Sequence, residues 1–157
     1  KTCMSMKGTL ILSSKWDKRF MQMAKFVSTW SKDPSTQVGS IAVRNRTVIA
    51  QGYNGFPRGI DDTTTRLDNR TEKYKFMVHA EMNVIYNAAE NGVSLKDSTV
   101  YVYGLPVCSE CAKGLIQAGI KRIVTPYQTV PENWQVSTTA SQSMFGEVGI
   151  RWDWLNF

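Results

Sequence analysis

The chain has 157 residues, of which 42% are hydrophobic and 20% charged, and it carries a formal net charge of +6. This size and composition favour one domain over residues 1–157, with enough apolar content for a core without disulfide bonds. No run of about eighteen apolar residues and no secretory signal is present, which argues against a membrane-spanning or secreted protein. We therefore expect a cytoplasmic protein, in the host cytoplasm if the chain is phage-encoded.

The positive charge is concentrated in the first half of the chain. Residues 1–75 hold 14 Lys and Arg against 6 Asp and Glu, whereas residues 76–157 hold 5 against 7. No run of five or six basic residues and no basic stripe with interleaved aromatic residues is present, so nucleic acid is not the predicted partner. A small phosphorylated substrate and a solvated basic surface without a partner are both compatible with this charge.

The predicted elements begin after an irregular arm over residues 1–13. Ser14 opens a capping-box pattern, and the apolar spacing after it predicts a helix to about residue 30. The apolar stripe, which we expect to be buried, consists of Trp16, Phe20, Met23, Ala24, Val27 and Trp30. After a polar loop, alternating residues predict a strand at 38–43, a turn at Arg44-Asn45-Arg46 and a second strand at 47–51.

The middle of the chain contains a glycine-rich loop and a polar stretch. Three glycines and a proline between Gly52 and Gly59 indicate special backbone angles and a close approach to a ligand, although an ordinary surface loop is the alternative. Residues 61–75 are compatible with a loop or a short exposed helix. Apolar residues from Val78 onward predict a helix ending near Asn91, with His79 at its entrance.

Strands and helices alternate over the remaining residues. The pattern predicts a strand at 99–103, a helix at 108–118 closed by Gly119, a strand at 120–125, a loop at 126–136, a helix at 137–147 and a strand at 149–157. Trp152 and Trp154 should lie on one side of the last strand. This order of elements predicts an α/β sandwich with a mixed sheet.

Two segments hold the only histidine and two of the three cysteines, and we interpret them as one zinc site. Two thiolates and one imidazole suit zinc, and three protein ligands leave a fourth tetrahedral position open, as in catalytic sites. His79, Cys108 and Cys111 are the predicted ligands, and Glu81 is the predicted proton shuttle for a hydrolysis. Taken alone, the Cys-x-x-Cys pair could be a redox pair or half of a structural zinc site.

The combination of His-x-Glu with a later Pro and Cys-x-x-Cys is the zinc deaminase signature. Three further blocks make the chain resemble the deoxycytidylate deaminase family: Lys32 to Gly39 (KDPSTQVG), Gly52 to Gly59 (GYNGFPRG) and Ile116 to Ile120 (IQAGI). The commoner family form has proline directly before the first cysteine, whereas here Val107 separates Pro106 from Cys108.

The resemblance implies a three-layer α/β/α sandwich with a mixed, mostly five-stranded sheet of the cytidine deaminase type. It also implies hydrolysis of dCMP to dUMP and ammonia, which feeds dTMP synthesis. By the same resemblance, Asn54 contacts the nucleotide, Lys32 and Tyr127 are candidates for the phosphate, and backbone near Ala80 holds the base. A dCMP substrate is then expected to be preferred over deoxycytidine.

Regulation and assembly are further implications of the resemblance. The Gly52 to Gly59 loop and the polar run to Arg70 would form a second nucleotide site, with Arg58, Arg66 and Arg70 as its cations. There dCTP would activate and dTTP would inhibit, with Mg²⁺ accompanying the triphosphate, and the chain would assemble as a homo-oligomer, by family resemblance a hexamer. A solvated polar loop is the alternative for this region.

Two other functions compete with dCMP deamination. The same zinc chemistry serves deaminases of a free nucleoside, a free base or a base in RNA, and the chain has no evident nucleic-acid-binding extension. A non-catalytic redox or structural zinc module would have no use for Glu81, and Cys3 would be its remaining candidate ligand.

Overall fold

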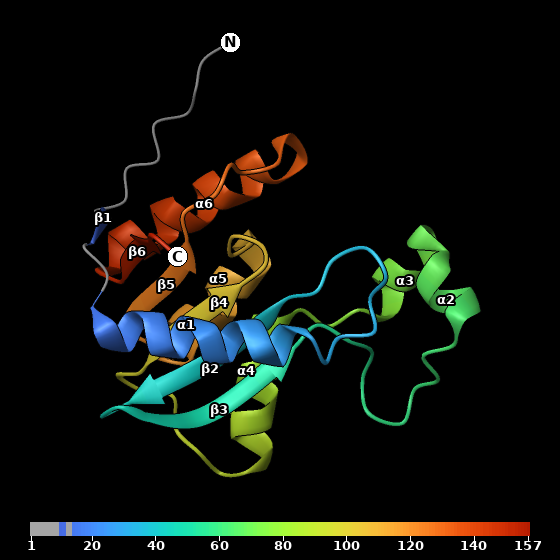
Figure 1. The fold of residues 1–157 in the computed structure, drawn as a ribbon, viewed down its shortest axis with the longest axis horizontal. Coiled ribbons are helices and arrows are strands. Elements are labelled where there is room, and N and C mark those ends of the chain that lie inside the picture. Colours follow the sequence, from blue (N-terminus) through green and yellow to red (C-terminus); the bar gives the residue numbers. More distant parts are fainter. Residues whose placement is uncertain (1–9, 12–13) are drawn as a thin grey trace.

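The computed structural model describes residues 10–11 and 14–157, which build a mixed sheet with helices on both faces (Figure 1). The strands are β1 (Leu10–Ile11), β2 (Gly39–Arg44), β3 (Thr47–Tyr53), β4 (Thr99–Tyr103), β5 (Arg122–Pro126) and β6 (Arg151–Leu155). The helices are α1 (Lys15–Ser28), α2 (Thr64–Asp68), α3 (Arg70–Phe76), α4 (Ala80–Glu90), α5 (Ser109–Gln117) and α6 (Glu132–Val148).

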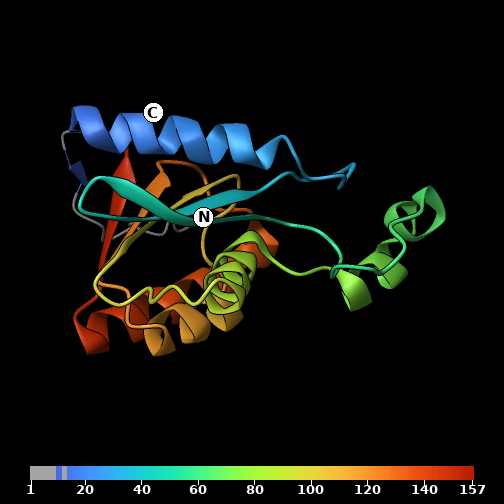
Figure 2. The same ribbon diagram turned by 90° about the horizontal axis from the view of Figure 1, so that it is seen from below.

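The strand order in the sheet is β1-β6-β5-β4-β2-β3. β2 runs antiparallel to both of its neighbours, β3 and β4, whereas β4, β5, β6 and β1 run parallel to one another. α1 covers one face of the sheet, and α4, α5 and α6 cover the other (Figure 2). Because β1 has only two residues, the sheet is essentially five-stranded, and the predicted three-layer sandwich is confirmed.

The start of α1 agrees with the sequence, but its apolar stripe is only partly buried. The Ser14 side chain accepts a hydrogen bond from the Asp17 N–H, as a capping residue does. Phe20 is buried against the sheet, whereas Met23 is 45% exposed and Trp30 is 44% exposed, so the prediction was wrong for these two. Trp30 follows the end of the helix, where helical spacing no longer applies, and its ring packs edge-on against Tyr53.

Three further boundaries differ from the predicted ones. Residues 61–75 contain two short helices, each opened by a capping side chain: Thr63 for α2 and Asn69 for α3. α6 begins at Glu132 within a predicted loop, because Pro131 precedes the helix and an acidic first turn suits its N-terminus. Leu10 and Ile11 of the predicted irregular arm form β1, while Cys3 and the rest of that arm lie outside the described residues.

Close packing fixes α4 against the sheet and against α5. A Cβ atom at Gly52 on β3 would lie 2.6 Å from the Val84 backbone nitrogen of α4, so only glycine permits this approach. Asn83 and Asn87 of α4 donate side-chain hydrogen bonds of 2.7 Å to the carbonyls of Tyr53 and Gln51 on the edge strand β3. The N-terminus of α4 is therefore held at a defined place beside the sheet.

Candidate zinc site and catalytic pocket

The candidate zinc ligands come from the starts of two neighbouring helices. His79 is the N-cap residue of α4 and Cys108 is the N-cap residue of α5, with Cys111 one turn further along α5. The His79 Nδ1 atom lies 3.4 Å from the Sγ atom of Cys108 and 3.4 Å from that of Cys111. The position of His79 at the helix entrance, which the sequence predicted, is confirmed.

The donor set fits a zinc ion. Tetrahedral bonds of about 2.3 Å to sulfur and about 2.0 Å to nitrogen place the sulfur and nitrogen atoms about 3.5 Å apart, close to the observed separations of 3.4 Å. Both cysteines are buried, and the three ligand atoms all lie within 4.8 Å of one another. Hydrogen bonds from the Cys111 side chain and the His79 ring lower the pKa of Cys108, which favours the thiolate that zinc binds.

Glu81 lies two residues beyond His79, in the first turn of α4. Its side chain is only 4% exposed, and this burial raises the pKa of Glu81 to about 7, although the nearby His79 ring lowers it. A carboxyl group with a pKa near neutrality can both accept and return a proton at physiological pH. Glu81 therefore has the environment that a general acid and base requires.

The candidate zinc ligand His79 and the nearby Glu81 both line a cavity of about 510 Å³. This volume lies in the usual range for small-molecule sites, about 300–1,000 Å³. The cavity walls come from the loop after α1, from α2 and α3, from the start of α4, from the segment before α5 and from the start of α6. The arrangement suits a ligand the size of a nucleotide, with its reacting atom beside the buried carboxyl group.

A buried polar network forms part of the cavity wall. The Asn54 amide donates to the Thr36 carbonyl at 2.8 Å and accepts from the Val38 N–H at 2.8 Å, so it holds the loop after α1. Lys73 of α3 donates to the Asp33 carboxylate at 2.9 Å, and both side chains are buried. The predicted nucleotide residue Asn54 thus lies in the cavity wall with its amide group occupied by the protein itself.

Comparison with known proteins decides the family. Residues 14–126 match the family described as the cytidine and deoxycytidylate deaminase zinc-binding region. The chain belongs to this zinc-binding deaminase family. The matched region contains both segments that carry the His79, Cys108 and Cys111 cluster, so the predicted zinc dependence is confirmed at the level of the family.

Curated relatives cover nearly the whole chain. An uncharacterized deaminase from the luxG 3′ region of Aliivibrio fischeri is 40% identical over 144 residues, which cover 90% of this chain and 95% of the relative. The deoxycytidylate deaminase of Mus musculus is 36% identical over 141 residues, which cover 86% of this chain and 76% of the relative. The family resemblance that the sequence predicted is therefore confirmed.

Solved structures share the fold. The dCMP deaminase of cyanophage S-TIM5, in complex with dCMP and dUMP, superposes with a TM-score of 0.71 at 22% identity over 90% of this chain and 98% of that one. The diaminohydroxyphosphoribosylaminopyrimidine deaminase/5-amino-6-(5-phosphoribosylamino)uracil reductase of Thermotoga maritima superposes with a TM-score of 0.62 at 22% identity over 88% of this chain and 35% of that one. This chain thus shares the deaminase fold.

None of the helices that the structure describes has the length and apolar character needed to span a membrane.

The other predicted substrate residues have different positions in this deaminase. Ala80 is buried at the start of α4 and lines the cavity. Lys32 does not line it, and its amine pairs with Asp62 at 2.7 Å on the surface. Tyr127, in the segment between β5 and α6, is 60% exposed and does not line the cavity either.

The three predicted regulatory arginines have separate partners. Arg58 pairs with Glu90 at the end of α4, at 2.8 Å. Arg66 lies over the Phe76 ring, 4.8 Å from its centre. Arg70 lines the catalytic cavity.

Sequence reasoning missed several residues of the cavity wall. Asn133 and Trp134 were assigned to a loop, yet they belong to the first turn of α6 and line the cavity. Lys73 was part of the polar stretch, and nothing in its immediate sequence indicates that it reaches Asp33, forty residues earlier. Asp33 lies in the Lys32 to Gly39 block, which the family resemblance marked as functional, so the sequence pointed to Asp33 but not to Lys73.

Proposed function

We propose that this protein is a zinc-dependent hydrolase that converts dCMP and water to dUMP and ammonia. The observation that carries the proposal is the cavity lined both by His79, from the zinc cluster, and by the buried Glu81 two residues further along the chain. Relatives named deoxycytidylate deaminase support the choice of substrate. The proposed catalytic domain spans residues 1–157.

In the proposed mechanism His79, Cys108 and Cys111 hold the zinc ion, and Glu81 moves protons. Zinc with three protein ligands lowers the pKa of water toward 7 and so supplies a hydroxide nucleophile at neutral pH. Glu81 accepts the proton of the attacking water and delivers it to ring nitrogen N3 while the new bond forms at C4. The same carboxyl then takes the proton of the new C4 hydroxyl group and transfers it to the amino group, so that the C4–N bond breaks, ammonia leaves and the C4 carbonyl of dUMP forms.

The backbone at the start of α4 is proposed to hold the base. The first N–H groups of a helix have no partner within it, and Ala80 provides such a group in the cavity wall. An N–H donor at this position suits the exocyclic oxygen of cytosine. Because Glu81 follows directly on the same turn, binding the base there would also bring N3 and C4 toward the carboxyl group.

The decisive experiment measures zinc and substrate preference together. Purified protein should contain one zinc per chain by mass spectrometry and should turn over dCMP more efficiently than deoxycytidine, CMP or adenosine. Protein without zinc, or with four protein ligands by X-ray absorption spectroscopy, would contradict the proposed site. Efficient turnover of another cytosine or purine compound, with none of dCMP, would favour the alternative substrates instead.

Regulation by dCTP and dTTP, with Mg²⁺ beside the triphosphate, stays a prediction. The different partners of Arg58, Arg66 and Arg70 mean that a shared triphosphate site would require at least Arg58 to leave Glu90. An effector acts only if it binds two states of the protein with different affinity. The test is a dCMP saturation curve with and without each triphosphate, and superimposable curves without measurable triphosphate binding would remove the idea.

Assembly into a homo-oligomer, by family resemblance a hexamer, and a cytoplasmic location also stay predictions. Phe26 is 64% exposed, and its ring packs edge-on against Trp30, whose ring in turn packs against Tyr53, giving an exposed aromatic cluster on the surface. Such a cluster suits burial in a contact between copies. Light scattering after gel filtration would give the mass, and a monomer at micromolar concentration would contradict the expected assembly.

A further inference from the structure

The cavity wall contains three side chains that can carry positive charge, and two of them are already committed. His79 belongs to the zinc cluster. Lys73 has its amine on the Asp33 carboxylate at 2.9 Å, with both side chains almost completely buried, so its charge is neutralised locally. Arg70 is the third, and among the described residues it forms no ion pair with a carboxylate, although Asp68 also lines this cavity.

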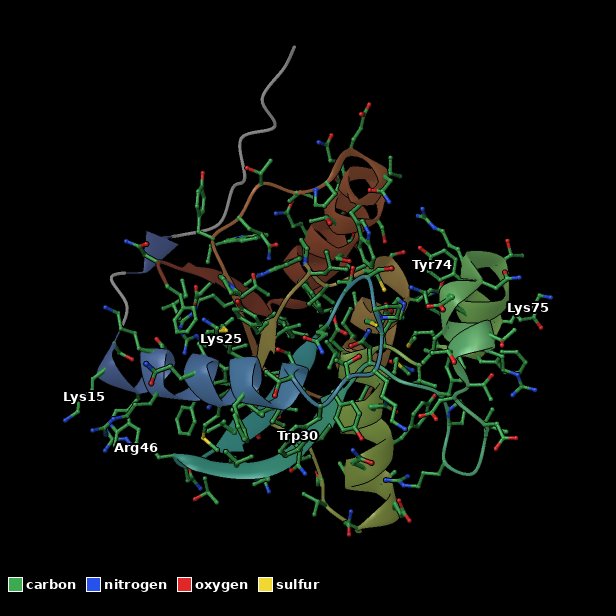
Figure 3. All side chains as sticks on the ribbon, turned by 45° about the vertical axis from the view of Figure 1, so that its right-hand side comes forward. Lys15, Lys25, Trp30, Arg46, Tyr74 and Lys75 are labelled. Atoms are coloured by element: carbon green, nitrogen blue, oxygen red, sulfur yellow. The ribbon has the colours of Figure 1, made fainter. Side chains whose placement is uncertain are left out.

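The guanidinium group of Arg70 is oriented by Tyr74, one helical turn further along α3. Arg70 donates from Nε to the Tyr74 hydroxyl at 3.0 Å, and its guanidinium carbon lies 5.4 Å from the centre of the Tyr74 ring. Figure 3 shows Tyr74 on the side of α3 nearer the body of the protein and Lys75 on the opposite side. Within the described residues, the two terminal nitrogens of Arg70 have no hydrogen-bond partner.

Such an arrangement suits an anion with several oxygens. The terminal nitrogens of a guanidinium can donate two parallel hydrogen bonds to one phosphate, a geometry that a lysine amine lacks. Because Tyr74 takes the Nε donor, it leaves that pair of nitrogens available and reduces the rotamer freedom that binding would otherwise remove. The remaining donors thus point to a phosphate group as the ligand class.

We propose that Arg70, oriented by Tyr74, binds the 5′-phosphate of the substrate and so determines the preference for a nucleotide over a nucleoside. This inference rests on the proposed dCMP deaminase function. Lys32, which the sequence favoured for the phosphate, is a weaker candidate because its amine is paired with Asp62 and it does not line the cavity. In this assignment Tyr74 is a positioning residue that acts through Arg70.

The experiment compares kcat/KM for dCMP and for deoxycytidine in the zinc-loaded protein and in four variants. Arg70→Gln should lower kcat/KM for dCMP about 10- to 100-fold and leave deoxycytidine turnover unchanged, because only the phosphate contact is lost. Tyr74→Phe should lower the dCMP value about 2- to 5-fold, also without affecting deoxycytidine. Lys75→Gln removes one positive charge from the same helix α3 outside the cavity lining, and it should change neither value more than about twofold.

Lys32→Gln is the competing arm of the test. A selective loss of dCMP turnover in Lys32→Gln but not in Arg70→Gln would overturn the proposal and restore the assignment from the sequence. Equal losses for dCMP and deoxycytidine in Arg70→Gln would also overturn it, because they would indicate a structural role. If Arg70→Gln failed to fold, by circular dichroism, then Tyr74→Phe and Arg70→Lys would carry the same comparison.

Binding measurements separate this inference from the proposed function. Calorimetry should show that wild-type protein binds dUMP more tightly than deoxyuridine, and that Arg70→Gln reduces this difference about 10-fold or more. Binding that follows this pattern without any deamination of dCMP would contradict the proposed reaction while keeping Arg70 as the phosphate residue. If the wild-type protein deaminates dCMP but binds dUMP and deoxyuridine with equal affinity, the assignment of Arg70 to the phosphate is contradicted and the proposed reaction is not.

Discussion

The zinc cluster, through His79, and the α2–α3 lobe (residues 64–76) line the same cavity but are built differently. The cluster lies where α4 and α5 meet, and a Cβ atom at Gly114 of α5 would come within 2.8 Å of the Met82 sulfur of α4. The lobe extends from the body, and its two helices contact mainly each other (Figures 1 and 2). Its described links to the body include the Lys73–Asp33 ion pair and a bridge between Gly55 and Val78.

This difference separates the proposed chemistry from the proposed recognition. Groups that transfer protons need fixed positions, and here they lie on helices packed tightly against each other and the sheet. Recognition of a mobile phosphate tolerates a less firmly attached support, because few buried contacts allow local opening at low cost. Substitutions at the two regions should therefore affect different measurements.

The largest expected effect is on catalysis, at Glu81. Glu81→Gln keeps the shape and burial of the side chain but removes its ability to transfer a proton, so kcat for dCMP should fall about 10²- to 10⁴-fold. Zinc content and the melting temperature should stay close to those of the wild type. A variant with near-normal kcat would require another residue to move the protons.

The next effect is on stability, at the link between the lobe and the body. Lys73→Met leaves the buried Asp33 carboxylate without its cation, which should lower the free energy of unfolding by about 3–5 kcal/mol. Lys75→Met is the matched control, because Lys75 pairs with Glu72 in the same helix but is 61% exposed, and it should cost less than about 1 kcal/mol. Urea unfolding of both variants makes the comparison, and equal losses would show that the buried pair is not the main link.

A third comparison uses two glycines that differ in packing. Gly52→Ala places a methyl group against α4 backbone atoms and should lower stability by about 1–3 kcal/mol together with catalytic activity, because α4 must move. Gly59→Ala meets no atom within 4 Å but has a positive φ of 79°, so it should cost only about 1 kcal/mol and leave kcat unchanged. Thermal unfolding and kcat for dCMP check both, and an unchanged kcat in Gly52→Ala would mean that α4 tolerates displacement.

The smallest expected effect is on stability at acidic pH, and it comes from Asp17, which does not line the cavity. Burial raises the pKa of Asp17, but hydrogen bonds from Arg122 and Tyr101 outweigh it and hold that pKa below its ordinary value of 3.8. Since the folded-state pKa is the lower one, this carboxylate stabilises the protein above pH 3.8, and the contribution is lost as pH falls further. Unfolding free energies between pH 3 and pH 7 should therefore fall less steeply at the acid end in Asp17→Asn than in the wild type.

The amino-acid sequence predicted the chemistry better than the recognition surface, and the reason is physical. A zinc site demands particular residue types at short spacing, so His79, Cys108 and Cys111 could be identified before their meeting in space was known. The pair of Lys73 and Asp33 forms only through the tertiary fold and has no local pattern. The excess of basic residues in residues 1–75 was also an indirect guide, because among the Lys and Arg that the structure describes in this half only Arg70 and Lys73 line the cavity.

Helix boundaries show the same limit. The side chain of Ser14 signalled the start of α1, whereas the start of α6 at Glu132 is preceded by Pro131, which gives no side-chain capping bond. The regularity of helical spacing also could not reveal that Met23 faces solvent, because several apolar residues of α1 compete for one covered face.

The side-chain hydrogen bonds of Asn83 and Asn87 to β3 also fix the position of α4 along its own axis. Four residues of helix advance about 6 Å and two residues of strand about 6.7 Å, so Asn83 and Asn87 match the alternate carbonyls of Tyr53 and Gln51. A slide of α4 by one residue would break both bonds at once and would carry His79 about 1.5 Å away from the cysteines. The hydrogen bonds to the edge strand β3 thus help to set the position of His79 relative to the two cysteines.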